Sequence, residues 1–247
     1  MNETSLVPLP SVRNLLSRSW ELYRANAKKF LIILVVPFVV SLVASLLLRP
    51  LDDPSVVFPD SLGLLVAGLL LNIIAAIVTI IAEIAIIYSI DDPAKSASEA
   101  FRKGLSRFFP FIWVGILTAL AVLGGFILLI IPGLIFAVWF SFSYFVLLFE
   151  DRRGIAALKQ SKHYVQGYFW QVVGRTLALL IVVVITVIVV GLIGSLFGSS
   201  GSTILQSLAT FLIVPLALAY YYWLYQAIRA AKGDLPMPAE PAPPIPV

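Results

Sequence analysis

The chain of 247 residues contains no cysteine and one histidine, His163. Without cysteine it has no disulfide, no thiolate metal ligand and no cysteine nucleophile. A single histidine leaves no histidine pair for a zinc site. Phosphate-binding loops, dinucleotide-binding loops, zinc-protease helices and G-x-S-x-G elbows are missing too. We therefore expect no metal, no cofactor and no enzymatic activity.

Charge is also scarce, since charged residues make up 12% of the chain and hydrophobic residues 60%. Soluble domains carry about 25% charged residues, so a soluble protein of this composition would expose apolar surface and aggregate. The mean hydropathy of +1.01 suits a bilayer instead. The net charge of +4 fits anionic headgroups beside membrane spans. We expect membrane lipids as partners and no nucleic acid.

Six apolar segments are long enough to cross the hydrocarbon core, which takes about 20 helical residues. They occupy residues 30–48, 64–89, 110–131, 133–149, 176–197 and 203–225. The sequence therefore predicts an all-α, polytopic membrane protein with six transmembrane helices in three hairpins. The first segment begins only at Phe30 and ends without a cleavage site, which predicts that it is retained as a span.

Basic residues mark one side of these segments. Of the 17 Lys and Arg residues, all except Arg49 lie in connections that would share one face. Basic residues in short loops stay cytoplasmic. The pattern predicts a multi-pass protein of the bacterial cytoplasmic (inner) membrane with cytoplasmic N- and C-termini. One span more or fewer would scatter the charges over both faces.

The predicted cytoplasmic connections have the apolar periodicity of amphipathic helices. They cover residues 11–29, 94–109 and 155–170, each leading into a span. Such helices lie in the membrane interface, so each hairpin is expected to follow one interfacial helix. The domain organisation is a flexible N-terminus at 1–10, a transmembrane domain at 11–232 and a disordered Pro-rich tail at 233–247.

Pro132 and Gly133 separate the third and fourth segments with no polar loop between them. Proline ends a helix and glycine permits a reversal, which predicts a tight structural turn at the outer surface. The alternative is one kinked helix over 110–149, which is far too long for a bilayer.

Glu83 is the only charged residue within the six segments. A charge at mid-bilayer costs about 2.5–3.5 kcal/mol on insertion scales. At about 100° per residue, Asn72, Thr79 and Glu83 share one helix face. This candidate intramembrane polar site is either a proton or cation relay, or a protonated Glu83 in an interhelical hydrogen bond.

The fourth segment is aromatic, and two interpretations stay open for it. Its aromatic residues are Phe136, Trp139, Phe140, Phe142, Tyr144, Phe145 and Phe149. They would line a groove for a lipid or another apolar ligand, or they would serve packing and interfacial anchoring.

Residues 128–170 carry a resemblance to a known family. Leu-Leu-Ile-Ile-Pro-Gly is followed by the aromatic segment ending at Phe149-Glu150-Asp151, then by Gly-Ile-Ala-Ala-Leu, Ser-Lys-His-Tyr and Gly-Tyr-Phe-Trp. The chain resembles uncharacterised bacterial integral membrane proteins related to the membrane domain of glycerophosphodiester phosphodiesterases. The resemblance implies a six-helix membrane domain. The phosphodiesterase domain is absent, so its activity is not implied.

The function expected from these features is that of a non-enzymatic integral membrane protein, handling lipids or supporting envelope assembly. The alternative is a small transporter or channel that uses the polar stripe around Glu83. A membrane-embedded lipid enzyme would need a cluster of catalytic residues, and the polar residues of this sequence are dispersed. A homo-oligomer and a membrane-protein partner are both compatible with the sequence.

Overall fold

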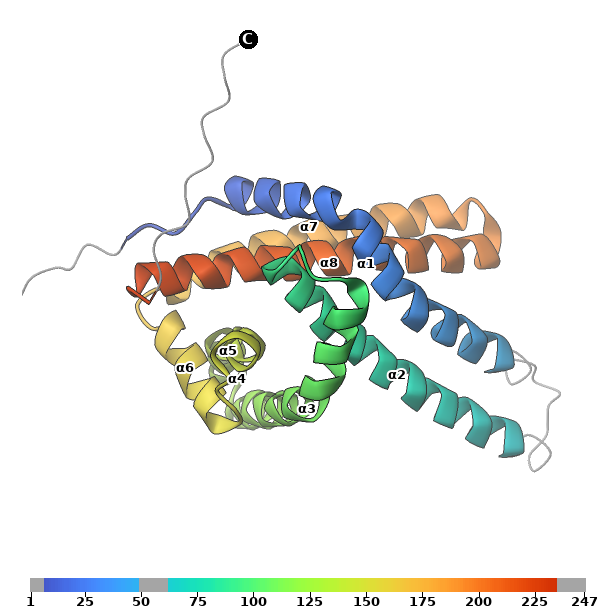
Figure 1. The fold of residues 1–247 in the computed structure, drawn as a ribbon, viewed down its shortest axis with the longest axis horizontal. Coiled ribbons are helices and arrows are strands. Elements are labelled where there is room, and N and C mark those ends of the chain that lie inside the picture. Colours follow the sequence, from blue (N-terminus) through green and yellow to red (C-terminus); the bar gives the residue numbers. More distant parts are fainter. Residues whose placement is uncertain (1–6, 49–61, 235–247) are drawn as a thin grey trace, which may run out of the picture. The chain divides into compact units, whose positions relative to one another are not determined.

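The computed structural model describes residues 7–48 and 62–234 (Figure 1). The helices are α1 (Val12–Leu48), α2 (Leu62–Asp91), α3 (Ala97–Leu128), α4 (Ile130–Trp139), α5 (Ser143–Glu150), α6 (Ile155–Val165), α7 (Phe169–Ser195) and α8 (Gly198–Ala231). The predicted all-α class is confirmed. The outer loop at 51–60, the first six residues and the tail from residue 235 lie outside the described residues.

Four segments of the described chain are long and apolar enough to cross a membrane. They are Leu65–Asp91, Ala97–Leu128, Ile130–Glu150 and Phe169–Ser195. The predicted spans at 30–48 and 203–225 belong to α1 and α8, and each includes side chains outside the described set. An integral membrane protein is therefore supported by four helical segments, and the full count of six stays a prediction.

The described residues form two compact units, one within 25–108 and the other comprising residues 7–24 and 109–234. In the first unit, α3 begins with a capping box. The Glu99 carboxylate accepts from the Ser96 backbone N–H over 3.0 Å, and the Ser96 hydroxyl accepts from the Glu99 N–H over 3.3 Å. These bonds satisfy two backbone donors that a helix start leaves unpaired. Before it, Asp92 and Lys95 form an ion pair of 2.8 Å.

The second unit is organised around α7 and α8, which pack along each other (Figure 1). Residues 12–24 of α1 lie along this helix pair, with Arg18 over the ring of Trp223 at 5.4 Å. Helix α6 packs against α5 and contacts α8. The predicted amphipathic segments at 11–29 and 94–109 are continuous with the apolar parts of α1 and α3, and α3 continues through Pro110 at this junction.

The helix break after α3 lies at Leu129, three residues before the turn expected at Pro132 and Gly133. Leu129 is extended (φ −169°, ψ 160°), and α4 begins at Ile130. Pro132 therefore lies in the first turn of α4, where its missing N–H removes no helical hydrogen bond. Gly133 serves a close approach, because a Cβ there would lie 2.5 Å from the Phe126 ring.

Candidate functional site

The predicted polar stripe lies along α2. Asn72 Nδ2 donates to the Gly68 carbonyl over 2.9 Å, and Thr79 Oγ1 donates to the Ala75 carbonyl over 2.8 Å. Glu83 is half-buried one turn beyond Thr79. The three residues share a helix face, but the side-chain hydrogen bonds of Asn72 and Thr79 stay within α2 and do not join these residues to one another. A relay and an interhelical bond both remain predictions for this stripe.

The fourth predicted span is interrupted in the middle. Helix α4 ends at Trp139 and α5 begins at Ser143, and the N–H groups of Ser141 and Phe142 between them do not make the i→i−4 hydrogen bond of an α-helix. Ser161 of α6 bridges the gap, because its hydroxyl donates to the Trp139 carbonyl over 2.7 Å and accepts from the Phe142 N–H over 3.1 Å. Ser161 is fully buried. Helix α6 thus supplies hydrogen bonds that the broken helix lacks.

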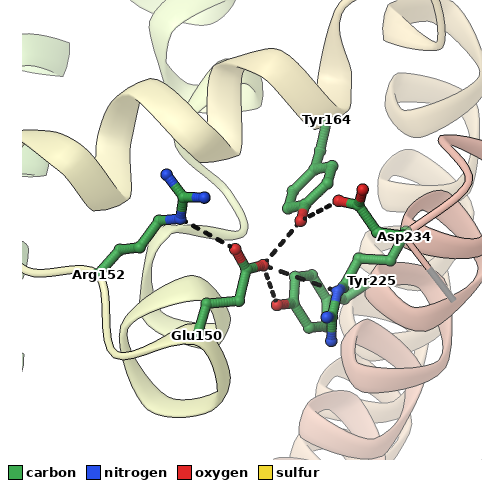
Figure 2. Close-up of polar contacts among 6 residues, drawn as sticks. Glu150, Arg152, Tyr164, Tyr225 and Asp234 are labelled. Carbon is green, nitrogen blue, oxygen red and sulfur yellow. Dashed lines mark hydrogen bonds and ion pairs between the residues drawn. The ribbon is translucent and has the colours of Figure 1, made fainter.

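A cluster of charged residues and tyrosines joins α5, α6 and α8 (Figure 2). At its centre, Glu150 Oε1 accepts from the hydroxyls of Tyr164 over 2.9 Å and Tyr225 over 2.7 Å. Arg229 Nε lies 3.7 Å from the same oxygen, and Arg152 Nε lies 3.3 Å from Oε2. We call these residues, together with Asp234, the polar junction.

Asp234 enters the polar junction through the way α8 ends. Gly233 has a φ of +84°, its N–H donates to the Ala230 carbonyl, and the Asp234 N–H donates to the Arg229 carbonyl. This is a Schellman motif, which glycine favours because it has no Cβ to clash at positive φ. The turn directs Asp234 Oδ2 to 2.7 Å from the Tyr164 hydroxyl.

The two tyrosines of the polar junction are buried, whereas Arg152 and Asp234 are exposed. Tyr164 is 1% exposed and Tyr225 0% exposed. Burial, followed by the hydrogen bond to Asp234, raises the pKa of Tyr164 above its ordinary value. The hydroxyl therefore stays protonated and acts as a donor at neutral pH. The arrangement suits a structural clamp, since each of these contacts joins two groups of the protein and both oxygens of the Glu150 carboxylate have partners.

An apolar cavity of about 170 Å³ lies where the start of α1 meets α7 and α8. Its lining consists of Trp20, Tyr23, Leu179, Val182, Val183, Thr186, Ile213, Leu216 and Ala217. Trp20 and Tyr23 stack with ring centroids 5.7 Å apart, and Trp20 is 52% exposed. Among the described residues of the lining, only Tyr23 and Thr186 carry a hydroxyl group, and Thr186 donates to the carbonyl of Val182.

A second cavity of about 100 Å³ lies further along the same two helices, lined by Val187, Val190, Gln206, Ala209 and Ile213. Both cavities contact Ile213, so they follow one another along α7 and α8. From Leu179 to Val190 the lining extends about 16 Å along α7, at the helical rise of 1.5 Å per residue. The two cavities therefore lie in a row along α7, and most of their lining residues are apolar.

Arg175 lies one helical turn before Leu179 and forms hydrogen bonds with the segment that precedes α1. Its Nε donates to the Pro10 carbonyl over 2.8 Å, and one terminal nitrogen donates to the Leu9 carbonyl over 2.6 Å. Gln171 binds the same segment, because its Oε1 accepts from the Leu9 N–H over 3.3 Å. These bonds hold the segment that leads into α1.

The sequence did not identify the polar junction or the cavities, because both depend on contacts between distant segments. The signal nearest to them is the distinctive stretch 128–170, which contains Glu150, Ser161 and Tyr164. Among the residues that the structure describes, no group of three or more His, Asp or Glu side chains could hold a metal ion.

Comparison of the chain with protein-family models, curated proteins and solved structures gives no match.

Proposed function

We propose that this protein is a non-enzymatic integral membrane protein of the bacterial cytoplasmic membrane that binds the acyl chain of a lipid. The observation that carries the proposal is the cavity of about 170 Å³ between Trp20, Tyr23 and the α7–α8 pair. An apolar cavity of about 150 Å³ in another protein accepts benzene or xenon. The space is thus large enough for several methylene groups, and the second cavity follows it along α7.

The position of the cavity favours a lipid over other apolar ligands. Its α7 lining, Leu179 to Thr186, lies well inside the candidate span Phe169–Ser195. At that depth the surrounding solvent is hydrocarbon, so acyl chains are the most abundant molecules able to enter. An empty void would deprive its walls of dispersion contacts, which a chain restores.

Native mass spectrometry of the gently solubilised protein tests the proposal. We expect the wild-type chain to retain a lipid at fixed stoichiometry and Ala217→Phe, which places a ring in the cavity, to lose it. Leu180→Phe adds the same ring on an exposed position of α7 and serves as the control. Equal lipid retention in wild type and Ala217→Phe would contradict the proposal. A lipid-free chain bound to another polypeptide would instead favour a role in envelope assembly.

We also propose six spans with cytoplasmic N- and C-termini, which the distribution of Lys and Arg supports. Because the chain has no cysteine, single cysteines can report orientation directly. We expect Ser55→Cys to react with an impermeant maleimide in intact spheroplasts. Lys159→Cys should react only after the membrane is opened. The reverse pattern would invert the proposed orientation.

A small transporter or channel is the second candidate, and the break between α4 and α5 is the observation in its favour. Discontinuous helices form substrate and ion sites in many transporters. Here, however, the carbonyls at the break already accept hydrogen bonds. The hydroxyl of Ser161 donates to the Trp139 carbonyl, and the hydroxyl of Ser143 donates to the Phe140 carbonyl over 2.8 Å. Ion flux in proteoliposomes that is lost in Glu83→Gln would favour this candidate over lipid binding.

A further inference from the structure

We propose that the bound chain belongs to an anionic lipid, whose negatively charged headgroup binds Arg175. This inference rests on the proposed function, since it assigns the headgroup of the lipid whose acyl chain fills the larger cavity. It concerns the end of the cavity nearest the start of α7, where an arginine stands beside an otherwise apolar space.

Helical spacing places Arg175 next to the cavity. Leu179, Val182 and Thr186 line the cavity, and Arg175 precedes Leu179 by four residues. Residues three and four apart are neighbours on one helix face, so Arg175 continues this lining by one turn. On α8, Tyr220 precedes the cavity in the same way, because it lies four residues beyond Leu216 and its hydroxyl donates to the Arg175 carbonyl over 3.0 Å.

The guanidinium of Arg175 is incompletely paired. It makes three hydrogen bonds, to the carbonyls of Leu9, Pro10 and Gln171. A guanidinium has five N–H donors, so two remain. All three acceptors are neutral, and within residues 7–48 and 62–234 no carboxylate forms an ion pair with Arg175.

A half-buried positive charge without a negative partner is unfavourable in an apolar surrounding. A phosphate or carboxylate would supply the missing charge, and a guanidinium matches the geometry of both. Beyond it, the lining residues of the two cavities follow α7 for about 16 Å. An anionic head followed by an extended apolar chain fits both features, and a phospholipid of the inner leaflet has this chemistry.

The test is competition between phosphatidylglycerol and phosphatidylethanolamine of the same acyl chains, read by native mass spectrometry of the full-length protein. We expect the wild-type protein to prefer the anionic lipid by about tenfold, the gain typical of a charge-assisted hydrogen bond. Arg175→Gln should bring the ratio to about one. Arg175→Lys, which keeps the charge, should retain a preference in the same direction.

Two control variants separate the possible causes. Gln171→Ala weakens the hold on Leu9 but keeps the cation, and it should keep the wild-type ratio. Lys159→Gln removes an exposed charge from α6 and should also keep it. If Lys159→Gln lowers the ratio as much as Arg175→Gln, general surface charge explains the preference and the inference is overturned. An unchanged ratio in a folded Arg175→Gln protein overturns it as well.

The two proposals fail in different ways. If Ala217→Phe retains lipid like the wild type, the acyl-chain site itself is wrong. If Ala217→Phe loses lipid while Arg175→Gln keeps the anionic preference, the acyl-chain site stands and only the assignment of the headgroup to Arg175 is wrong.

Discussion

The hydroxyl of Tyr164 donates to the carboxylate of Glu150 over 2.9 Å, and this bond joins α6 to the end of α5. The same hydroxyl oxygen lies 2.7 Å from Asp234 Oδ2, beyond the end of α8. A tyrosine hydroxyl has one proton, so it can donate fully to only one of the two carboxylates at a time. Tyr164 therefore holds three segments together, but at any moment one of the two carboxylates lacks a full hydrogen bond from its hydroxyl.

The competition for this proton predicts that two similar substitutions have different effects on stability. In Asp234→Asn, the new amide can donate to the Tyr164 oxygen while Tyr164 donates to Glu150, so we expect unchanged or slightly raised stability. Glu150→Gln removes the partner of Arg229 and turns a donor toward Arg152. Breaking a shielded ion pair is costly, and we expect a loss of about 2–4 kcal/mol in the free energy of unfolding.

Thermal midpoints in one detergent, compared with the wild type, would measure both effects. His163→Gln, an exposed change next to Tyr164, controls for general effects of altering α6. A larger loss in Asp234→Asn than in Glu150→Gln would mean that Asp234, not Glu150, is the main acceptor for Tyr164.

The buried hydroxyl of Tyr164 also predicts a dependence of stability on alkaline pH. Burial, then the hydrogen bonds to Asp234 and Glu150, raise its pKa above the ordinary value of 10.0. In the unfolded chain Tyr164 loses its proton near pH 10, whereas in the fold it keeps it. Stability from this group is therefore complete below pH 10 and falls above it, by at most about 1.4 kcal/mol per pH unit.

Thermal midpoints from pH 8 to pH 11.5 test this for the wild type and Tyr164→Phe. The difference between the two proteins should be constant below pH 10 and shrink above it. Subtracting the variant removes the contributions of lysines, which titrate in the same range. A constant difference up to pH 11.5 would show that the Tyr164 hydroxyl ionises equally in folded and unfolded chains.

Ser161 provides a test of the break between α4 and α5. Ser161→Ala leaves the Phe142 N–H and the Trp139 carbonyl without the partner described above, and a buried unsatisfied group costs about 1–3 kcal/mol. Ser143 is equally buried, but its hydroxyl bonds the Phe140 carbonyl, which also accepts from the Ser143 N–H over 3.1 Å. We expect Ser161→Ala to lower the thermal midpoint clearly more than Ser143→Ala. Equal effects would mean that water replaces Ser161 at the break.

The sequence predicted the helical class and the apolar segments because both follow from local composition. The second segment was expected at 64–89 and is found at Leu65–Asp91, since the apolar run itself ends beside Asp91 and Asp92. The break at 140–142 could not be predicted, because Phe140, Ser141 and Phe142 include no proline or glycine. Its stability depends on Ser161, 19 residues away from Phe142.

The polar junction could not be predicted from the sequence either, because its contacts join residues that are far apart in the chain. Glu150 bonds Tyr164 and Tyr225, which are 14 and 75 residues away in the chain. By contrast, Glu83 could be identified as a candidate site residue, because a charge inside an apolar segment can be recognised in the sequence alone. The sequence thus indicates where a polar group is unusual, whereas only the fold indicates which polar groups meet.

Adjacent glycines in α3 provide a final test of how closely α3 and α4 approach. A Cβ on Gly125 would lie 2.8 Å from the Cα of Gly133, and a Cβ on Gly124 would meet nothing within 4 Å. The obstacle at Gly125 is backbone, which cannot rotate away as a flexible side chain can. We expect Gly125→Ala to lower the free energy of unfolding by about 1–3 kcal/mol, the range for overpacking. Gly124→Ala should be neutral or stabilising, since alanine favours helix over glycine by up to about 1 kcal/mol.

Thermal midpoints of the two variants decide the matter, because the same substitution on neighbouring residues differs only in what the new methyl group meets. If both variants unfold like the wild type, the contact between Gly125 and Gly133 is looser than described, and the break at Leu129 alone would determine the path from α3 to α4.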